Sequence, residues 1–266
     1  MSGRQSAYRF DAAIVRRPAA SVVRGLRAVD GGDPTYEGVV AEHDAYIAAM
    51  KIAGVEVDVL APLEAFPDSI FVEDPALVFA QGAILLRPGA QSRAGETAEI
   101  APVLKQKFET VLELSAPGFA DGGDILLTPQ GVMIGLSSRT DLEGARALQA
   151  CLTKLGLESR IVETPEGVLH FKTDCSLLDD ETVFVTERLA RSGVFDDYET
   201  VIVPEGEEAA ANALRVNDVV MVGAQFPKTI ERLDRLGYAL VPLETSQIGK
   251  IDAGLSCMSL RWKRGA

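Results

Sequence analysis

Short apolar runs rich in β-branched residues alternate with amphipathic stretches along the whole chain. The runs are AAIVRR near residue 12, EVDVLAP near 56, AILLRP near 83, DILLT and GVMIGL between 124 and 136, TVFVTE near 182, ETVIVP near 199 and DVVMVGA near 218. Each run has the length and composition of a short, mostly buried strand. The stretches 38–54, 94–109, 141–156 and 227–237 have the period of a helix, and several end in the glycine that favours a helix C-terminus.

The order of these elements suggests a repeated unit of strand, strand, helix and strand. Five such units begin near residues 10, 67, 121, 170 and 212, with a length of about 45 to 60 residues each. This rhythm is typical of a radial or stacked α/β architecture, while an ordinary α/β sandwich remains open from periodicity alone. Because no Pro/Ser/Gly-rich linker divides the chain, we expect one domain over residues 1–266.

Composition excludes several classes of protein. Of the 266 residues, 47% are hydrophobic, yet no apolar run is long enough for a membrane span, and the start MSGRQSAYRF lacks the apolar core of a signal peptide. We therefore expect a soluble cytoplasmic protein. The formal net charge of −13 argues against nucleic acid or an anionic membrane as partner and favours a cationic small substrate.

Cysteine and histidine are scarce, so each one can be considered by itself. Cys151, Cys175 and Cys257 are too widely spaced for a disulfide framework or a CxxC metal site, and we expect reduced thiols. Cys151 and Cys175 fit core positions, whereas Cys257, in KIDAGLSCMSLRW, is either core or a nucleophile. His43 falls among polar neighbours of a helix and is predicted to lie at the surface. His170, where a loop meets a strand, is the candidate general acid and base.

Charged residues interrupt the apolar pattern at four places. FPDSIFVEDPALVF carries Asp68, Glu73 and Asp74, whose burial would need a cation such as a guanidinium or ammonium ligand. In DGGD, the glycine pair indicates either a tight turn or a site in which Asp121 orients a histidine. Arg93 and Arg139 follow strands of successive units, so a radial fold would bring both to one face, where they suit a carboxylate.

Six ordered strings together resemble one enzyme family. They are LAPLEAFPDSIFVEDPALV, LLRPGAQSR, DGGDILLT, IGLSSRT, LHFKTDCSL and KIDAGLSCMSL. In this order and at these spacings they are similar to the dimethylarginine dimethylaminohydrolases of the guanidino-modifying pentein superfamily, over about Asp11 to Leu260. The resemblance implies an α/β propeller of five ββαβ units around a pseudo-fivefold axis.

The resemblance also implies roles for single residues. Cys257 would be the nucleophile, His170 the general acid and base, and Asp121 the acid that orients the histidine. The remaining positions that match substrate-binding residues of the family are Leu26 in the lid, the acids Asp68, Glu73, Asp74 and Asp252, the carboxylate-binding Arg93 and Arg139, and Ile251 through its backbone carbonyl. No metal and no organic cofactor would be needed.

The implied reaction is hydrolysis of Nω-methylated L-arginine to L-citrulline and methylamine or dimethylamine, through a covalent S-alkylthiouronium on Cys257. Arginine deiminases and amidinotransferases share this intermediate and stay as alternatives, although deiminases typically have an acid two residues after the histidine, where this chain has Lys172. A binding protein of the same fold is a third alternative, disfavoured by the presence of Cys257, His170 and Asp121 together. The oligomeric state is open, a homodimer being one possibility.

Overall fold

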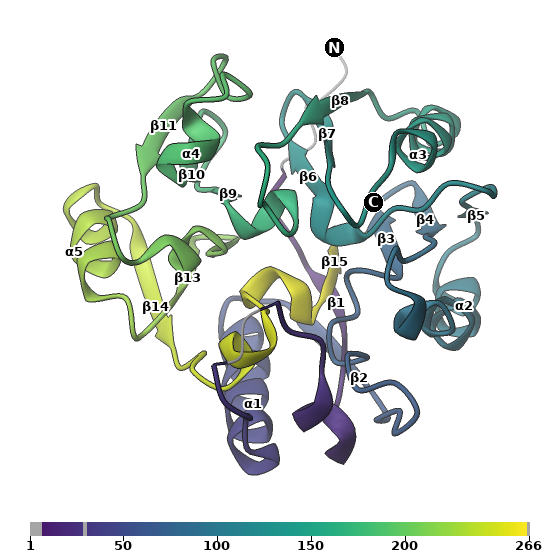
Figure 1. Cartoon of the computed structure of the whole chain (residues 1–266), viewed down its shortest axis with the longest axis horizontal. Coiled ribbons are helices and arrows are strands. Elements are labelled where there is room, and N and C mark those ends of the chain that lie inside the picture. Colours follow the sequence, from purple (N-terminus) through teal and green to yellow (C-terminus); the bar gives the residue numbers. More distant parts are fainter. Residues whose placement is uncertain (1–6, 29–30, 265–266) are drawn as a thin grey trace.

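The computed structural model describes residues 7–28 and 31–264, which contain five three-stranded sheets arranged around a common centre (Figure 1). The sheets are β15 (Leu260–Trp262), β1 (Ala12–Arg16) and β2 (Glu56–Leu60); β3 (Ala76–Phe79), β4 (Gly82–Leu85) and β5 (Val111–Glu113); β6 (Ile125–Thr128), β7 (Gly131–Leu136) and β8 (Ser159–Glu163); β9 (Cys175–Leu177), β10 (Thr182–Val185) and β11 (Glu199–Ile202); and β12 (Leu214–Val216), β13 (Val219–Gly223) and β14 (Ala239–Leu243).

Every sheet follows the same rule. Its middle strand pairs antiparallel with the first strand and parallel with the third. A parallel pair needs a crossover, and a helix forms part of it in each unit. These helices are α1 (Tyr36–Ile52), α2 (Glu96–Lys107), α3 (Leu142–Lys154), α4 (Glu187–Ala190) and α5 (Pro227–Arg235). The expected rhythm of five units is therefore confirmed.

The unit boundaries differ from those expected. The first unit does not begin with two successive strands near residue 10, because β1 takes its antiparallel partner β15 from the end of the chain, in the register Ala12↔Trp262. This pairing covers the edge that β1 would otherwise expose and closes the ring. The other expected starts, near residues 67, 121, 170 and 212, fall in loops just before β3, β6, β9 and β12.

The helix ends agree with the sequence pattern. Thr35 and Asp141 cap α1 and α3 by accepting hydrogen bonds from Gly38 N–H and Gly144 N–H. Gly54, Gly156 and Gly237 follow α1, α3 and α5 with positive φ angles, as expected for a glycine that ends a helix. None of the helices in the described part of the chain combines the length and the hydrophobicity needed to cross a bilayer.

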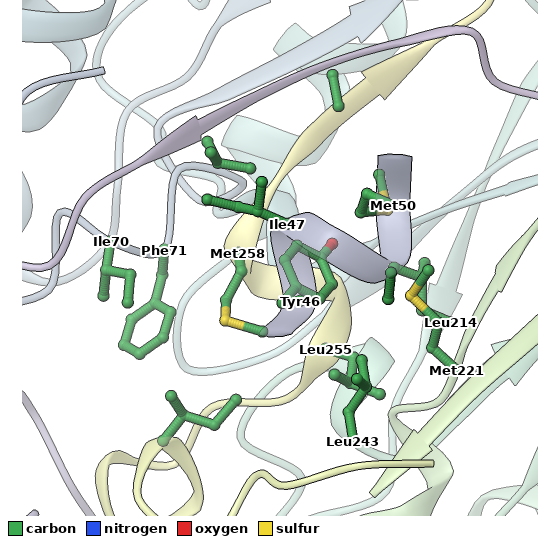
Figure 2. Packing of buried hydrophobic residues seen from close by; sticks show 14 of the residues in the cluster. Tyr46, Ile47, Met50, Ile70, Phe71, Leu214, Met221, Leu243, Leu255 and Met258 are labelled. Carbon is green, nitrogen blue, oxygen red and sulfur yellow. The ribbon is translucent and has the colours of Figure 1, made fainter. Parts of the chain in front are cut away.

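Hydrophobic clusters fill the spaces between neighbouring sheets. Figure 2 shows the cluster between the first and fifth units, where Tyr46 and Met50 of α1 pack with Leu214, Met221 and Met258. The Tyr46 side chain is fully buried, and its hydroxyl is 2.5 Å from Ser259 Oγ. As predicted, Cys151 and Cys175 are buried in the core, in clusters that join the third unit to its two neighbours.

The surface position predicted for His43 is wrong. Its side chain is fully buried in α1, and neither ring nitrogen has a hydrogen-bond partner. The helical period places position 43 on the face of Val39, Tyr46, Ile47 and Met50, whereas the polar residues that suggested exposure are its neighbours along the chain. Burial lowers the pKa of His43 from 6.5 to about 4, with a smaller contribution from Arg17.

Candidate active site

One small pocket gathers most of the residues that the sequence singled out. All predicted site residues except Asp121 and Glu73 line it, together with Phe71, Leu169 and Ala253. Loops that precede the first strands of four sheets supply Asp74, Asp121, His170 and Cys257, just before β3, β6, β9 and β15. Residues separated by up to about two hundred positions in sequence therefore meet because the ring brings equivalent loops together.

Cys257 lies in a short 3₁₀ helix, Leu255–Met258, and is partly exposed. Burial of the sulfur, with the negative charges of Asp74 and Glu73 nearby, raises the pKa of the Cys257 thiol to about 11. A hydrogen bond from the backbone of Gly254 to the sulfur and the positive charge of Lys172 both partly oppose this increase. The free thiol is therefore protonated at neutral pH.

Asn212 contacts the loop that carries Cys257, and it was not predicted from the sequence as a site residue. Its Nδ2 atom is 3.9 Å from Cys257 Sγ, and its Oδ1 atom accepts a hydrogen bond of 3.0 Å from Ser256 N–H. Asn212 comes just before β12, which is the place that the other site residues occupy in their own units. Its position in the repeat is the signal that could have identified it.

His170 and Asp121 form a hydrogen-bonded pair. The His170 Nε2 and Asp121 Oδ2 atoms are 3.1 Å apart, and the fully buried Asp121 also accepts a 2.7 Å hydrogen bond from Gly89 N–H. Burial alone would lower the pKa of His170, but the hydrogen bond to Asp121 and the charge of Asp74 raise it above its usual value. Gly123 lies directly against the ring, since a Cβ atom there would lie 2.8 Å from His170 Cγ.

Asp74 is held as a buried anion inside the pocket. Burial opposes its ionisation, but the guanidinium of Arg93 and the charge of His170 outweigh this effect and lower the pKa of Asp74. Its carboxylate accepts a hydrogen bond from Gly123 N–H at 3.0 Å and pairs with Arg93. A carboxylate that is ionised, oriented and buried is suited to hold a guanidinium.

The two predicted carboxylate-binding arginines lie in different surroundings. Arg93 is buried and donates to Glu96, to Asp74 and to the carbonyls of Asp68 and Phe71. The side chain of Arg139 is 18% exposed, and its ion pair with Asp121 is long, at 3.4 Å. Arg139 therefore has more guanidinium donors left for a ligand than Arg93 has.

Glu73 lies behind the pocket rather than in its lining. Its Oε1 atom is 2.6 Å from Lys172 Nζ and 3.0 Å from Arg261 Nη2. The residue two positions after the histidine, which would be an acid in a deiminase, is thus a cation that pairs with Glu73. The predicted contact between Glu73 and a guanidinium stays a prediction, and it would require Glu73 to turn from these partners.

Two acids, Asp68 and Asp252, hold the segment around Leu26, the predicted lid, at the pocket. Leu26 is 37% exposed, and its backbone N–H donates to Asp68 Oδ1 at 2.9 Å. Ala28 N–H donates to Asp252, which has a positive φ angle of 55° directly after the buried Ile251. Burial raises the pKa of Asp68, so a nearby ammonium group would favour its ionised form.

Three side chains of the site lie close enough together to ligate one metal ion. Asp74, Asp121 and His170 each have a ligand atom within 4.8 Å of the others. These groups already pair with Arg93, with Gly89 N–H and with one another. The expectation that catalysis needs no metal stays a prediction.

Known proteins resemble this chain over most of its length. Residues 30–171 match the family model described as "N,N dimethylarginine dimethylhydrolase, eukaryotic". The N(G),N(G)-dimethylarginine dimethylaminohydrolase of Pseudomonas aeruginosa is 41% identical over 254 residues, which is 95% of this chain and 100% of that protein. The chain belongs to the dimethylarginine dimethylaminohydrolase family. Another relative of the same name, from Streptomyces coelicolor, is 32% identical and aligns with 94% of this chain and 96% of its own length.

Solved structures agree with membership of the dimethylarginine dimethylaminohydrolase family. The Pseudomonas aeruginosa enzyme, as a Cys-to-Ser mutant complexed with citrulline, superposes with a TM-score of 0.92 and 40% identity, covering 96% of this chain and 100% of that one. The N-terminal domain of a cyanobacterial arginine dihydrolase has a TM-score of 0.83 at 19% identity, over 95% of this chain and 98% of that one, and shares the fold. The expected pentein propeller is confirmed.

Proposed function

We propose that this chain hydrolyses Nω-methylated L-arginine to L-citrulline and methylamine or dimethylamine, with Cys257 as nucleophile. The observation that carries the proposal is the set of groups at one pocket: a cysteine thiol, an imidazole that is hydrogen-bonded to a buried carboxylate behind the lining, and a separate ionised carboxylate in the lining. This is the set that nucleophilic attack on a guanidinium carbon requires, and it occurs in a member of the dimethylarginine dimethylaminohydrolase family.

The two ends of the pocket match the two ends of the substrate. Asp74, next to Cys257 and His170, would hold the guanidinium N–H groups and fix the plane of the guanidinium carbon. At the other end, Arg139, with support from Arg93, would bind the α-carboxylate. The carboxylate of Asp68 and the carbonyl of Ile251 would accept hydrogen bonds from the α-ammonium group, while Asp252 and Leu26 close the pocket.

The reaction proceeds in two halves. The Cys257 thiolate attacks the guanidinium carbon, and the tetrahedral intermediate expels methylamine or dimethylamine as His170 donates a proton to the leaving nitrogen. An S-alkylthiouronium then remains on the sulfur. His170, now neutral, takes a proton from water, whose oxygen attacks the same carbon. Collapse of the second intermediate breaks the C–S bond, its hydroxyl proton passes to solvent, and citrulline and the thiolate are released.

Arginine itself is the competing substrate, because a deiminase uses the same kind of site. The pairing of Lys172 with Glu73 disfavours this alternative. Lys172 takes the place of an acid that would hold a second guanidinium nitrogen. That side of the guanidinium is therefore free to carry a methyl group.

The test is citrulline release from Nω,Nω-dimethyl-L-arginine and from L-arginine by the wild type, Cys257→Ser and the control Cys151→Ser. We expect turnover of the methylated substrate that is lost in Cys257→Ser and kept in Cys151→Ser, because Cys151 lies in the core between the second and third units and does not line the pocket. Turnover of arginine alone would establish a deiminase. Absence of turnover on both, or full activity of Cys257→Ser, would refute the proposal.

A further inference from the structure

Asp124, the last residue of the DGGD string, is a fully buried acid that lies outside the lining of the active-site pocket. Its carboxylate accepts three hydrogen bonds, and all three donors are neutral: one backbone N–H and two hydroxyl groups. A buried carboxylate needs groups that satisfy its oxygens, so the positions of these donors indicate what the acid holds in place. They lie in the two loops that carry His170 and Arg139.

One oxygen of Asp124 holds the loop of His170. Oδ1 accepts a 2.8 Å hydrogen bond from the N–H of Phe171, the residue directly after the histidine. Phe171 begins a 3₁₀ helix, Phe171–Thr173, whose first N–H groups have no acceptor within the helix, and the side chain of His170 does not cap it. Asp124 supplies this acceptor from the neighbouring unit.

The segment 121–124 therefore contacts the histidine in three ways. Asp121 pairs with the imidazole at 3.1 Å, Gly123 lies against its ring, and Asp124 holds the backbone that follows it. Because Gly122–Asp124 is itself a short 3₁₀ helix, these three contacts have a fixed spacing. The position of the imidazole relative to Asp121 thus depends on the hydrogen bond of Asp124.

The other oxygen of Asp124 holds the loop of Arg139. Oδ2 accepts hydrogen bonds of 2.7 Å from Ser137 Oγ and 2.6 Å from Thr140 Oγ1. Ser137 Oγ in turn accepts from the N–H of Arg139 at 2.9 Å, and Thr140 Oγ1 accepts from the N–H of Asp121 at 3.1 Å. The two hydroxyls thus connect the buried carboxylate to the backbone of both residues.

A carboxylate at this depth is unfavourable by itself. Burial raises the pKa of Asp124, and the charge of His170 together with hydrogen bonds from Thr140, Ser137 and Phe171 partly opposes this effect. Apolar groups of the same shape could fill such a space without this free-energy cost. The presence of the acid is therefore explained by the loops that it connects.

We propose that Asp124 is a positioning residue that joins the two ends of the active site. It fixes His170 through the N–H of Phe171. It fixes the loop of Arg139 through the hydroxyl of Ser137. The inference rests on the proposed function, in which His170 moves protons and Arg139 binds the substrate carboxylate. Loss of the first connection should lower kcat, and loss of the second should raise KM.

Steady-state kinetics with Nω,Nω-dimethyl-L-arginine tests this division. Asp124→Ala should lower kcat by at least about tenfold, and Asp124→Asn should restore part of it, because an amide oxygen still accepts from Phe171 N–H. Ser137→Ala should raise KM by about five- to tenfold with kcat nearly unchanged. The matched control is Glu207→Ala, which removes another buried carboxylate that accepts from two backbone N–H groups, at the start of α5. It should leave kcat and KM unchanged.

A second readout does not depend on turnover. The chain has only two histidines, so the imidazole nitrogen signals of ¹⁵N-histidine-labelled protein can be assigned with His43→Leu. Asp124→Ala should move the His170 signals toward those of free imidazole, and Asp124→Asn should move them less. Ser137→Ala and Glu207→Ala should leave them in place.

Unchanged His170 signals in a folded Asp124 variant would overturn the proposal. So would a kcat of Asp124→Ala no lower than that of Glu207→Ala, or an unchanged KM in Ser137→Ala. If Asp124→Ala does not fold, Asp124→Asn and Ser137→Ala decide. If the wild type releases no citrulline, the proposed function fails, while the His170 signals and the Kd of Ser137→Ala for L-citrulline still test the two connections of Asp124.

Discussion

The ionisation of Cys257 should depend on the substrate. With the pKa raised to about 11 by burial and by Asp74 and Glu73, the thiolate is a fraction of about 3 in 10,000 at pH 7.5. Forming it at that pH therefore costs about 5 kcal/mol, since one pKa unit corresponds to about 1.4 kcal/mol. If nothing offset this free energy, the rate of attack by Cys257 would be lower in proportion to the small thiolate fraction.

The attraction between the thiolate and a bound guanidinium is strong enough to offset most of this free energy. Two opposite unit charges about 4 Å apart attract each other by about 4 kcal/mol at the effective dielectric constant of about 20 that suits partly buried sites. A substrate cation held by Asp74 would lie beside the Cys257 sulfur and thus lower the thiol pKa by up to about 3 units. We therefore expect the substrate, rather than a permanent neighbour, to generate the nucleophile.

The assay is a pH titration of the ultraviolet absorbance of the thiolate, with the titration of Cys257→Ser subtracted. It is made for the free protein, with L-citrulline, which is neutral at the distal end, and, by rapid mixing, with L-arginine, which is cationic there. The free protein should titrate above the unperturbed thiol value of about 8.5. Arginine should lower the apparent pKa by more than about 1 unit relative to citrulline. A free thiol that titrates at or below about 8.5, or equal effects of the two ligands, would refute the reasoning.

Three further predictions concern other parts of the molecule. Arg139→Gln should raise KM for amino-acid substrates by about 10- to 100-fold, with little effect on alkylguanidines that lack a carboxylate, as steady-state kinetics on both substrate types would show. Asn212→Ala should lower kcat by about tenfold with KM nearly unchanged, because it frees the Cys257 loop; an unaltered kcat would contradict this role. Since the native pKa of His43 is about 4, stability should be complete above pH 6.5 and fall by up to about 3 kcal/mol as the pH decreases toward 4. Urea unfolding of wild type and His43→Leu between pH 7.5 and 4.5 tests this, and an equal loss in both proteins would exclude His43 as the cause.

Much of the fold follows from the local pattern of apolar and polar residues, but the closure of the ring by β15 and β1 does not. The apolar runs that became β6, β7, β10 and β13 were strong enough to predict the repeat. The strand β15 is only three residues long and pairs with β1 from the other end of the chain, so no local signal marks it as part of the first unit. His43 was misplaced because its sequence neighbours are polar, while the helix turns position 43 inward.

The site was predictable as a set of residues but not as a set of contacts. Scarcity singled out Cys257 and His170, and the acids within an apolar run singled out Asp74. The sequence could not reveal that Arg93 is already paired with acids and carbonyls. Nor could it reveal that Glu73 pairs with Lys172. Those contacts depend on side-chain directions, which change from one residue to the next and are fixed only when the loops meet.

The alternation of side chains in these loops explains how one ring can hold two distinct spaces. Asp74 and Cys257 face the active-site pocket, while their neighbours Glu73 and Ser256 face the space at the centre of the ring. Each loop leads directly into a buried inner strand, so its residues are held by the same core that joins the sheets. A change in the pairing of Lys172 with Glu73 would therefore alter the charge next to the Cys257 sulfur. The two spaces are separated by side chains, but they are linked electrostatically through this pair.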